Sequence, residues 1–425
     1  MIKNKFKDTE IGEIPIDWDV KKLGEISNIT MGQSPSSKTY NYEGIGEPFF
    51  QGRKDFGDKY PKITMWCTDP KKIGKKGDVL ISVRAPIGDL NIAPINCCIG
   101  RGLAAISHND LENNEFLYYL LKDSEKRLLS IYGGTGTVFS AITKGNIVNF
   151  SIPVPPLEEQ EAIANTLSCL DGKIECKNKQ NKILEEIAQS IYNEWFVNFN
   201  FPMKLIDENF KEEIGYKDAG GEMEFNEELG KEIPQGWKVG KLKNFFKFIK
   251  GKKPQKLFEN YKNNFLEYLT INSFNSCEKQ YGDPKNKVIL KELDLAMVMD
   301  GASSGTLYYG KNGILGSTFS KIELLNNKFS YEYLYHVLRH YQKIISENTT
   351  GSAIPHTDKE LVYNIKIPIA TSKLQEEFTM ISKRCRLQII KNNIQNQQLS
   401  EIRDLLLPKL MSGQVRIPLN EEKIA

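Results

Sequence analysis

Two stretches of the chain carry apolar residues in alternating steps of three and four. The first stretch has these positions in phase: Leu157, Ile163, Leu167, Leu170, Ile174, Lys177, Asn181, Leu184, Ala188, Ile191 and Trp195. The second has Leu374, Phe378, Cys385, Ile389, Asn392, Asn396, Leu399, Arg403, Leu406 and Leu410. Both seams keep the heptad phase far longer than the ~11-residue average helix, so they predict two long helices, each about 60 Å in length.

Both seams become polar near the middle, at Lys177 and Asn181 in the first and at Asn392 and Asn396 in the second. Two antiparallel helices would bring these polar centres together, and a buried polar pair fixes the register at some cost in stability. The pattern therefore predicts an antiparallel coiled coil. The alternative is a pair of separate amphipathic helices, each lying on its own domain.

The regions that precede the helices repeat each other. EIPIDWDVKKL at residues 13–23 recurs as EIPQGWKVGKL at 232–242, at an offset of 219, and EFLYYLL at 115–121 recurs as EYLYHVL at 332–338. GQSP at 32–35 corresponds to GKKP at 251–254, and Gln160 corresponds to Gln375 at an offset of 215. Because the offset drifts so little, the two halves are homologous and form an internal pseudo-two-fold repeat.

Each half begins with short β-like runs, such as DVLISV (78–83), NIVNFSIPV (146–154) and YNIKIPI (363–369), and has a helical stretch near 112–130 or 330–347. This pattern predicts an α+β fold, with two homologous mixed α/β domains separated by the two long helices. The predicted order is a first domain at 1–155, a helix at 156–200, an acidic linker at 201–230, a second domain at 231–371, a second helix at 372–411 and a tail at 412–425.

The overall composition is that of an ordinary globular protein, but the charged residues are unevenly distributed along the chain. The 425 residues carry a net charge of +3, and no apolar run approaches a membrane span. The N-terminus lacks the apolar core of a signal peptide, so we expect a cytoplasmic protein. Residues 236–256 hold eight lysines and no acid, whereas 207–232 hold ten acids against three lysines. The basic run, which also contains aromatic residues, suggests a phosphate-facing surface, with an ordinary solvated face as the alternative, and the acidic segment suggests a solvated linker.

The sequence contains no convincing catalytic or metal-binding motif. His336 and His340 have helical spacing but lack the glutamate and third ligand of a zinc site, and the seven cysteines are scattered without CxxC spacing. The Gly-Thr-rich stretch at 133–137 lacks the Lys-Ser/Thr ending of a phosphate-binding loop. We therefore expect a protein that binds rather than reacts, with no metal and no cofactor of its own.

Several short motifs, in this order and in duplicate, resemble one family. They are EIPxxW, a strand followed by RAPIG (84–88) or DGASSG (300–305), TGT or TGS (135–137, 350–352), and a helix that ends in WFVNFNFP (195–202) or PKLMSGQVRI (408–417). The chain resembles the DNA-specificity (S) subunit, HsdS, of type I restriction-modification systems.

The resemblance implies two target-recognition domains, each reading one half of a bipartite, asymmetric site in double-stranded DNA. The helices would set the spacer and dock methyltransferase (M) subunits, which carry S-adenosylmethionine, and restriction/motor (R) subunits would join that complex. This chain would be a non-catalytic partner in DNA methylation. Two alternatives remain, namely a specificity subunit of a related bipartite-site methyltransferase/nuclease complex and a coiled-coil interaction scaffold. A self-sufficient methyltransferase is excluded because the chain has no room for a cofactor domain.

The expected DNA contacts lie on loops of the two domains. In the first domain the candidates are Gln33, Ser34, Ser36, Arg53, Lys54, Arg84, Arg101, Thr135 and Thr137. In the second they are Lys250, Lys252, Lys253, Asn272, Ser303, Ser304, Thr349, Ser352 and His356. The lysines would contact phosphates and the loop side chains would read base edges. For Arg84 the alternative is a structural salt bridge. Asp300 occupies the position of Arg84 in the second half, which predicts unequal half-sites and a non-palindromic target.

Overall fold

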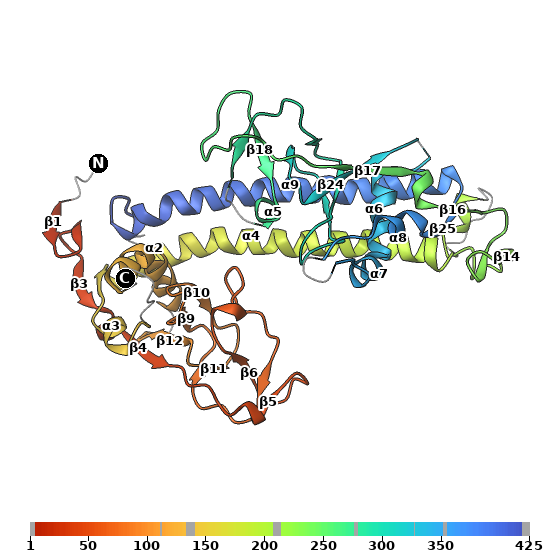
Figure 1. The fold of residues 1–425 in the computed structure, drawn as a ribbon. Coiled ribbons are helices and arrows are strands. Elements are labelled where there is room, and N and C mark those ends of the chain that lie inside the picture. Colours follow the sequence, from red (N-terminus) through yellow and green to blue (C-terminus); the bar gives the residue numbers. More distant parts are fainter. Residues whose placement is uncertain are drawn as a thin grey trace. The chain divides into compact units, whose positions relative to one another are not determined.

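The chain forms two compact units, one made of residues 1–176 and 395–425 and the other of 177–394. A computed structural model describes residues 5–110, 113–132, 141–206, 214–275, 279–326, 328–351 and 355–418. Two long helices, α4 (Leu157–Tyr192) and α9 (Ser372–Met411), each contribute one part to each unit (Figure 1).

The first unit is built around two sheets and a covering helix. A four-stranded sheet, in the order β10-β9-β12-β4, consists of β4 (Ser27–Met31), β9 (Val79–Ser82), β10 (Leu90–Ile92) and β12 (Leu103–His108). A five-stranded sheet, in the order β5-β7-β6-β11-β8, consists of β5 (Tyr40–Asn41), β6 (Glu47–Phe50), β7 (Trp66–Cys67), β8 (Ile73–Gly74) and β11 (Cys97–Ile99). Two-stranded pairs join β1 (Phe6–Thr9) to β2 (Gly12–Pro15) and β3 (Asp19–Lys22) to β13 (Ser151–Val154). The helices are α1 (Leu23–Ile26), α2 (Asn114–Tyr132) and α3 (Lys144–Val148).

The second unit repeats this arrangement, except that no strand among its described residues corresponds to β5. Its first four-stranded sheet, β17-β24-β21-β22, consists of β17 (Phe246–Lys250), β21 (Leu295–Val298), β22 (Leu307–Tyr309) and β24 (Phe319–Leu324). The other, β19-β18-β23-β20, consists of β18 (Leu266–Leu269), β19 (Tyr281–Gly282), β20 (Ile289–Leu290) and β23 (Gly313–Leu315). Paired strands are β14 (Met223–Asn226) with β15 (Lys231–Pro234) and β16 (Lys238–Lys241) with β25 (Lys366–Ile369). The helices are α5 (Ile271–Asn275), α6 (Tyr331–His340), α7 (Gln342–Glu347) and α8 (Lys359–Asn364).

This correspondence confirms the predicted mixed fold and its internal repeat. The central strands β9 and β21 are buried along their whole length, which explains why their sequences, VLIS and LAMV, are continuous apolar runs rather than alternating ones. Each lies between two antiparallel neighbours, and in both units one strand pair, β6 with β11 and β18 with β23, is parallel.

Three local features differ from the sequence-based expectation. The run 146–154 is not one strand, because Thr143 caps a short helix, α3, whose capping box pairs the Thr143 and Asn146 side chains with each other's backbone N–H. Asp358 caps α8 in the second unit in a similar way, by accepting from Glu360 and Leu361 N–H groups. Part of the expected acidic linker is a paired strand, β14, and α4 gives way at Asn193 to a short π-helix that ends at Val197.

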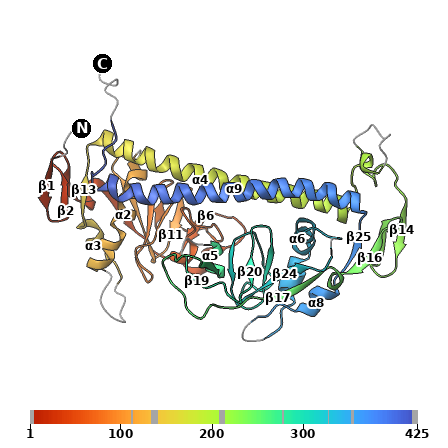
Figure 2. The same cartoon turned by 90° about the horizontal axis from the view of Figure 1, so that it is seen from above.

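The two long helices pack antiparallel within each unit, and both views show them side by side (Figures 1 and 2). In the second unit the Asn392 amide donates a 2.8 Å hydrogen bond to Asn181, and Asn392 is fully buried. The expected pairing of the polar centres is therefore present. The first seam position, Leu157, is 48% exposed, whereas these predicted seam positions are buried or half-buried: Ile163, Leu167, Leu170, Ile174, Leu184, Ile191, Trp195, Phe378, Ile389, Leu399, Leu406 and Leu410.

His336 is buried and contacts both long helices, so its role is structural. Its ring nitrogens lie 2.9 Å from Gln189 Oε1 on α4 and 2.9 Å from Ser382 Oγ on α9, and the residue is 2% exposed. Among the described residues, no group of three or more His, Cys, Asp or Glu side chains is placed to hold a metal ion. Burial, reinforced by the nearby Arg386 and Arg339, lowers the pKa of His336 to about 3.

This pKa predicts how the stability of the second unit depends on pH. In the unfolded chain a histidine has a pKa of about 6.5. Because the folded-state pKa is lower, the stability is fully present above pH ~6.5 and is lost as the pH falls toward ~3. Between pH 6.5 and 5 we expect wild type to lose roughly 1.5 kcal/mol more unfolding free energy than His336→Gln, which keeps hydrogen-bonding groups but does not titrate. Urea unfolding at the two pH values tests this, and parallel pH dependences would contradict it.

Candidate nucleic-acid interface

In the first domain, three chain segments meet so closely that only glycine fits between them. Gly32 N donates to Leu103 O (2.9 Å), Gln33 N to Ile99 O (3.0 Å) and Gly100 N to Phe50 O (2.8 Å). A Cβ atom on Gly32 would collide with the carbonyl of Gly100. This arrangement, which we call the glycine junction, joins the ends of β4 and β6 to the β11–β12 turn.

The first glycine junction brings together three predicted DNA contacts. Gln33 and Ser34 follow β4, and Arg101 lies in the β11–β12 turn, with its backbone N–H donating to Ser34 Oγ at 3.2 Å. The side chains of Gln33 and Arg101 are exposed. The junction therefore presents one amide and one guanidinium group from segments nearly 70 residues apart in the sequence.

The second domain builds the same junction with different side chains. Gly251 N donates to Phe319 O (2.9 Å), Lys252 N to Leu315 O (3.0 Å) and Gly316 N to Leu269 O (3.0 Å). A Cβ atom on Gly251 would collide with the carbonyl of Gly316, as at Gly32. The exposed residues Lys252 and Lys253 stand where the first domain has Gln33 and Ser34. The repeat thus keeps the backbone and exchanges neutral polar groups for two cations.

Arg84 lies on the loop between β9 and β10. Ser82 braces this loop, because its hydroxyl donates to Pro86 O (2.9 Å) and accepts from Asp89 N–H (3.0 Å). Arg84 is exposed and forms no ion pair with any described residue, which removes the support for a structural salt bridge. Arg53 is attached to the same loop by a 2.8 Å contact between its Nε and Asp89, and it remains 55% exposed.

In the second domain Asp300 occupies the position of Arg84. Its carboxylate contacts two of the predicted DNA-binding residues, His356 and Lys250. His356 Nδ1 lies 2.8 Å from one carboxylate oxygen of Asp300, and Lys250 Nζ lies 3.7 Å from the other. Backbone hydrogen bonds from Gly301 to Pro355 and from Thr357 to Met299 hold the two loops together. Sequence reasoning noted the charge difference at Asp300 but did not include this residue among the site residues.

Asn272 lines a cleft of about 730 Å³ in the second domain. The cleft also contains a second amide side chain, one ammonium group, one carboxylate and four hydroxyl groups, from Gln280, Lys279, Glu259, Tyr268, Thr270, Ser273 and Thr318. Amide side chains suit the bidentate contacts that proteins make with adenine. Asn272 was among the predicted DNA contacts, whereas Thr270 and Gln280 were missed because no short motif marks them.

The remaining candidates have different outcomes. Ser36 and Lys54 are exposed, while Ser303 and Thr349 are half-buried. Ser304 is only 5% exposed, and its hydroxyl lies within hydrogen-bonding distance of the carbonyl groups of Met299, Gly301 and Pro355. The structure therefore gives Ser304 a loop-bracing role, and its assignment as a DNA contact stays a prediction. Thr135, Thr137 and Ser352 lie outside the described residues.

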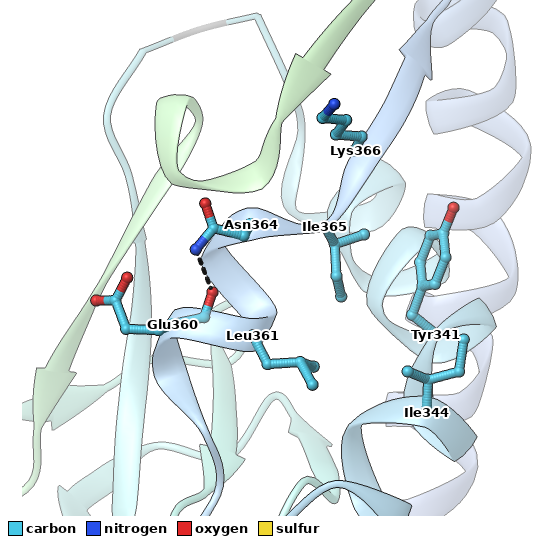
Figure 3. A pocket seen from close by; sticks show the side chains of 7 residues that line it. All are labelled: Tyr341, Ile344, Glu360, Leu361, Asn364, Ile365 and Lys366. Carbon is cyan, nitrogen blue, oxygen red and sulfur yellow. Dashed lines mark hydrogen bonds between the residues drawn. The ribbon is translucent and has the colours of Figure 1, made fainter. Parts of the chain in front are cut away.

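A second hollow, of about 470 Å³, lies in the second unit beside α7 and α8 (Figure 3). Its wall is largely aliphatic and aromatic, and the Asn364 amide in it donates to the Glu360 carbonyl of the same helix at 2.9 Å. None of the predicted DNA contacts lines this hollow.

Taken together, two similar domains that present different polar and basic groups at equivalent loops define a two-site nucleic-acid-binding protein. The chain belongs to the type I restriction-modification specificity subunits, because the family model described as "Type I restriction modification DNA specificity domain" matches residues 15–186 and 234–402. It is thus a DNA-specificity subunit rather than a catalytic one.

Individual relatives agree with this assignment. The MjaIX specificity subunit of Methanocaldococcus jannaschii is 31% identical, with 98% of this chain and 97% of that protein covered. The putative MjaX specificity subunit of the same organism is 48% identical, over 44% of each chain. A crystal structure of a type I S subunit from M. genitalium shares the fold, with a TM-score of 0.56, 20% identity and coverage of 99% of this chain and 100% of that one. In the described part of the chain, no helix has the length and apolarity needed to cross a membrane.

Proposed function

We propose that each domain reads one half of a bipartite, asymmetric site in double-stranded DNA and thereby directs a type I restriction-modification complex. The observation that carries this proposal is the duplicated glycine junction, which holds Gln33 and Ser34 in one domain and Lys252 and Lys253 in the other. A constant backbone with variable side chains is what two related readers of different sequences require. The exchange of Arg84 for Asp300 supports unequal half-sites for the same reason.

Within the second domain, the roles divide by chemistry. Lys250, Lys252 and Lys253 are exposed ammonium groups, and such point charges contact phosphates and fix the register on the duplex. The cleft that contains Asn272 and Gln280 offers amide groups, which distinguish base edges. In the first domain, the exposed Arg84 guanidinium would read a base, with guanine as its preferred partner.

This division predicts the effect of changing Lys250, Lys252 and Lys253 together to Gln. Each lost phosphate contact lowers the slope of log K against log[salt] by about 0.9, so we expect a decrease of roughly one to three units. Affinity should fall for every DNA sequence, with the methylated motif unchanged. The charge-matched control changes Lys217, Lys328 and Lys343, which are exposed and lie outside the long helices, to Gln and should leave the slope unaltered. Salt titrations and methylated-motif sequencing of the reconstituted complex provide the measurements.

Arg84→Ala supplies the contrasting result in the same assay. Loss of a bidentate base contact should relax the preference at one position, at a cost of ~1–3 kcal/mol. A lysine variant with a changed motif and an unchanged salt slope would show that the basic run reads bases and that the roles are reversed.

We infer that the long helices dock the methyltransferase subunits, which would bring S-adenosylmethionine. The support is an apolar stripe on α9, where Met380, Leu387 and Ile394 recur every seven residues and are 48%, 48% and 52% exposed. Ile187 and Ile402, at equivalent positions of the two helices, are also about half exposed. Apolar side chains at helical spacing on an exposed face suit a partner helix.

The stripe predicts that changing Met380, Leu387 and Ile394 together to Glu will disrupt docking without unfolding the chain. Interface anchors of this kind contribute 2 kcal/mol or more, so binding of the methyltransferase subunit should weaken by roughly 30-fold or more. Asn149, Gln235 and Asn244 changed to Glu add the same charge at exposed polar positions outside the long helices and serve as the control. Equal binding by the two variants in a co-purification and titration assay would exclude this face.

We also propose that the helices set the unread spacer between the half-sites. Each helix passes without interruption from one unit to the other, so its residue count is fixed by the sequence. This role, together with DNA as the partner, fits the cytoplasmic location and the attachment of restriction/motor subunits expected from the sequence.

Removing one heptad from each helix, residues 172–178 and 395–401, keeps the seams in phase and retains the Asn181–Asn392 pair. Seven helical residues span about 10 Å, which corresponds to about 3 bp. The reconstituted complex should therefore methylate a motif whose spacer is about 3 bp shorter, with both half-sites unchanged. Methylation of the original motif with its original spacing would show that the length of the helices does not set the spacer between the half-sites.

A further inference from the structure

In the first unit, two buried carboxylates of α4 pair with arginines, one on α9 and one just after its end. Asp171 on α4 is 5% exposed and accepts hydrogen bonds from Tyr119 Oη (2.5 Å) and Arg403 Nη1 (2.7 Å). Burial acts to raise the pKa of Asp171, but the bonds from Tyr119 and Arg403 outweigh it, and the pKa is lowered. The carboxylate is therefore charged in the folded chain.

The second pair closes the end of the helices. Glu159 is 2% exposed and accepts from Trp18 Nε1 (2.9 Å) and from Arg416 Nη2 (2.7 Å). Arg416 also bonds both oxygens of Asp17, at 3.0 and 2.7 Å, and its guanidinium lies 5.8 Å from the Trp18 ring. The residues that follow α9 are thus bound to the first domain through ionic contacts.

The second unit has different chemistry at the equivalent positions. At the offset of 215 that relates Gln160 to Gln375, Asp171 corresponds to Arg386 and Arg403 to Ala188. Ala188 and Arg386 line the same small cavity. Arg386 is 9% exposed, lies 3.9 Å over the Tyr309 ring and pairs with Glu185 at 3.4 Å.

At the helix end the difference is equally clear. Leu374 corresponds to Glu159, and Phe201 corresponds to Arg416. Phe201 stacks on Trp237, the counterpart of Trp18, with ring centroids 5.7 Å apart and planes 15° from parallel. One unit is therefore closed by an arginine over a tryptophan and a buried glutamate, and the other by stacked aromatic rings and a leucine.

These differences decide which helices can pair. If two first halves paired with each other, Asp171 would face Ala188 instead of Arg403 and would keep only the Lys59 ammonium group, 3.9 Å away, while Glu159 would face Phe201 and lose its cation. If two second halves paired, Arg386 would face Arg403, and Arg416 would face Leu374. A buried charge without its partner is strongly destabilising, whereas the natural pairing satisfies all of these charges.

We propose that these positions form a pairing code, by which each half of the chain accepts the other half and rejects a second copy of itself. The partner that fits the exposed face of each half, when separated, is the complementary half of this protein. The inference concerns how the chain assembles and does not depend on its DNA-binding role.

The test uses the folded full-length chain, with a protease site inserted in the exposed turn between Ala219 and Gly220. The cleaved protein, mixed in isotopically labelled and unlabelled forms, is incubated at a urea concentration at which the halves exchange labels. Native mass spectrometry then counts the pairs. Random pairing gives about one half unlike pairs, whereas the code predicts an excess of unlike pairs over each like pair of at least about tenfold. A near-random mixture would overturn the proposal.

Two double variants test whether the charges at these positions, rather than the overall fit of the two surfaces, decide which halves pair. Ala188→Arg with Phe201→Arg gives the first half its own cations opposite Asp171 and Glu159, so like pairs of first halves should increase at least about tenfold. Ala188→Glu with Phe201→Glu disturbs the natural partner equally but supplies the wrong charge, and it should produce no such pairs. If the Arg and Glu variants form like pairs to the same extent, or if neither does while labels exchange, the code is wrong.

Discussion

The hydrogen bond between Asn392 and Asn181 is the constraint on which the helix pair depends. A seam of apolar residues would tolerate slipping by one heptad, because each heptad resembles the next. With Asn392 fully buried, a slip of one heptad would place its amide against Ile174 or Ala188 and leave a polar group without a partner. The Asn392–Asn181 hydrogen bond therefore restricts an apolar helix interface, which could pair in several registers, to a single register.

The register matters because both domains are seated on these helices. Tyr119 of α2 reaches Asp171, and His336 of α6 reaches Gln189 and Ser382, so a shift of either helix would break buried contacts with a domain. The glycine junctions fix the loops within each domain in a similar way. Their close backbone contacts hold the loop ends, while the exposed side chains can vary. The fold thus separates a rigid framework from a variable surface.

Sequence reasoning predicted the parts of this structure that leave periodic or repeated signals. The seams were found because their apolar residues recur at a regular spacing along the chain. The repeat and the polar centre at Asn181 and Asn392 were found because the two halves of the sequence can be compared with each other. The short helices α3 and α8 were missed, since a cap residue, Thr143 or Asp358, decides against the strand-like run that follows.

Contacts between residues distant in the sequence were harder to predict. Ser304 looked like a loop residue available to DNA, but the carbonyl groups that surround its hydroxyl come from its own loop and from Pro355, which only the folded chain brings near. Arg403 occupies a seam position and looks like an interruption of the apolar pattern until Asp171 and Tyr119 are seen around it. No periodicity identifies such a partner.

The buried ion pairs also limit how the two halves can diverge. Replacing a buried pair by apolar residues of similar volume is often neutral, whereas losing one member is costly. Asp171 and Arg403 lie in different halves of the chain, so a change in one half requires a matching change in the other. Exposed positions such as Arg84 and Lys252 carry no such requirement. The surface of each domain can therefore change independently of the other half, while the contacts that hold the helices must change together.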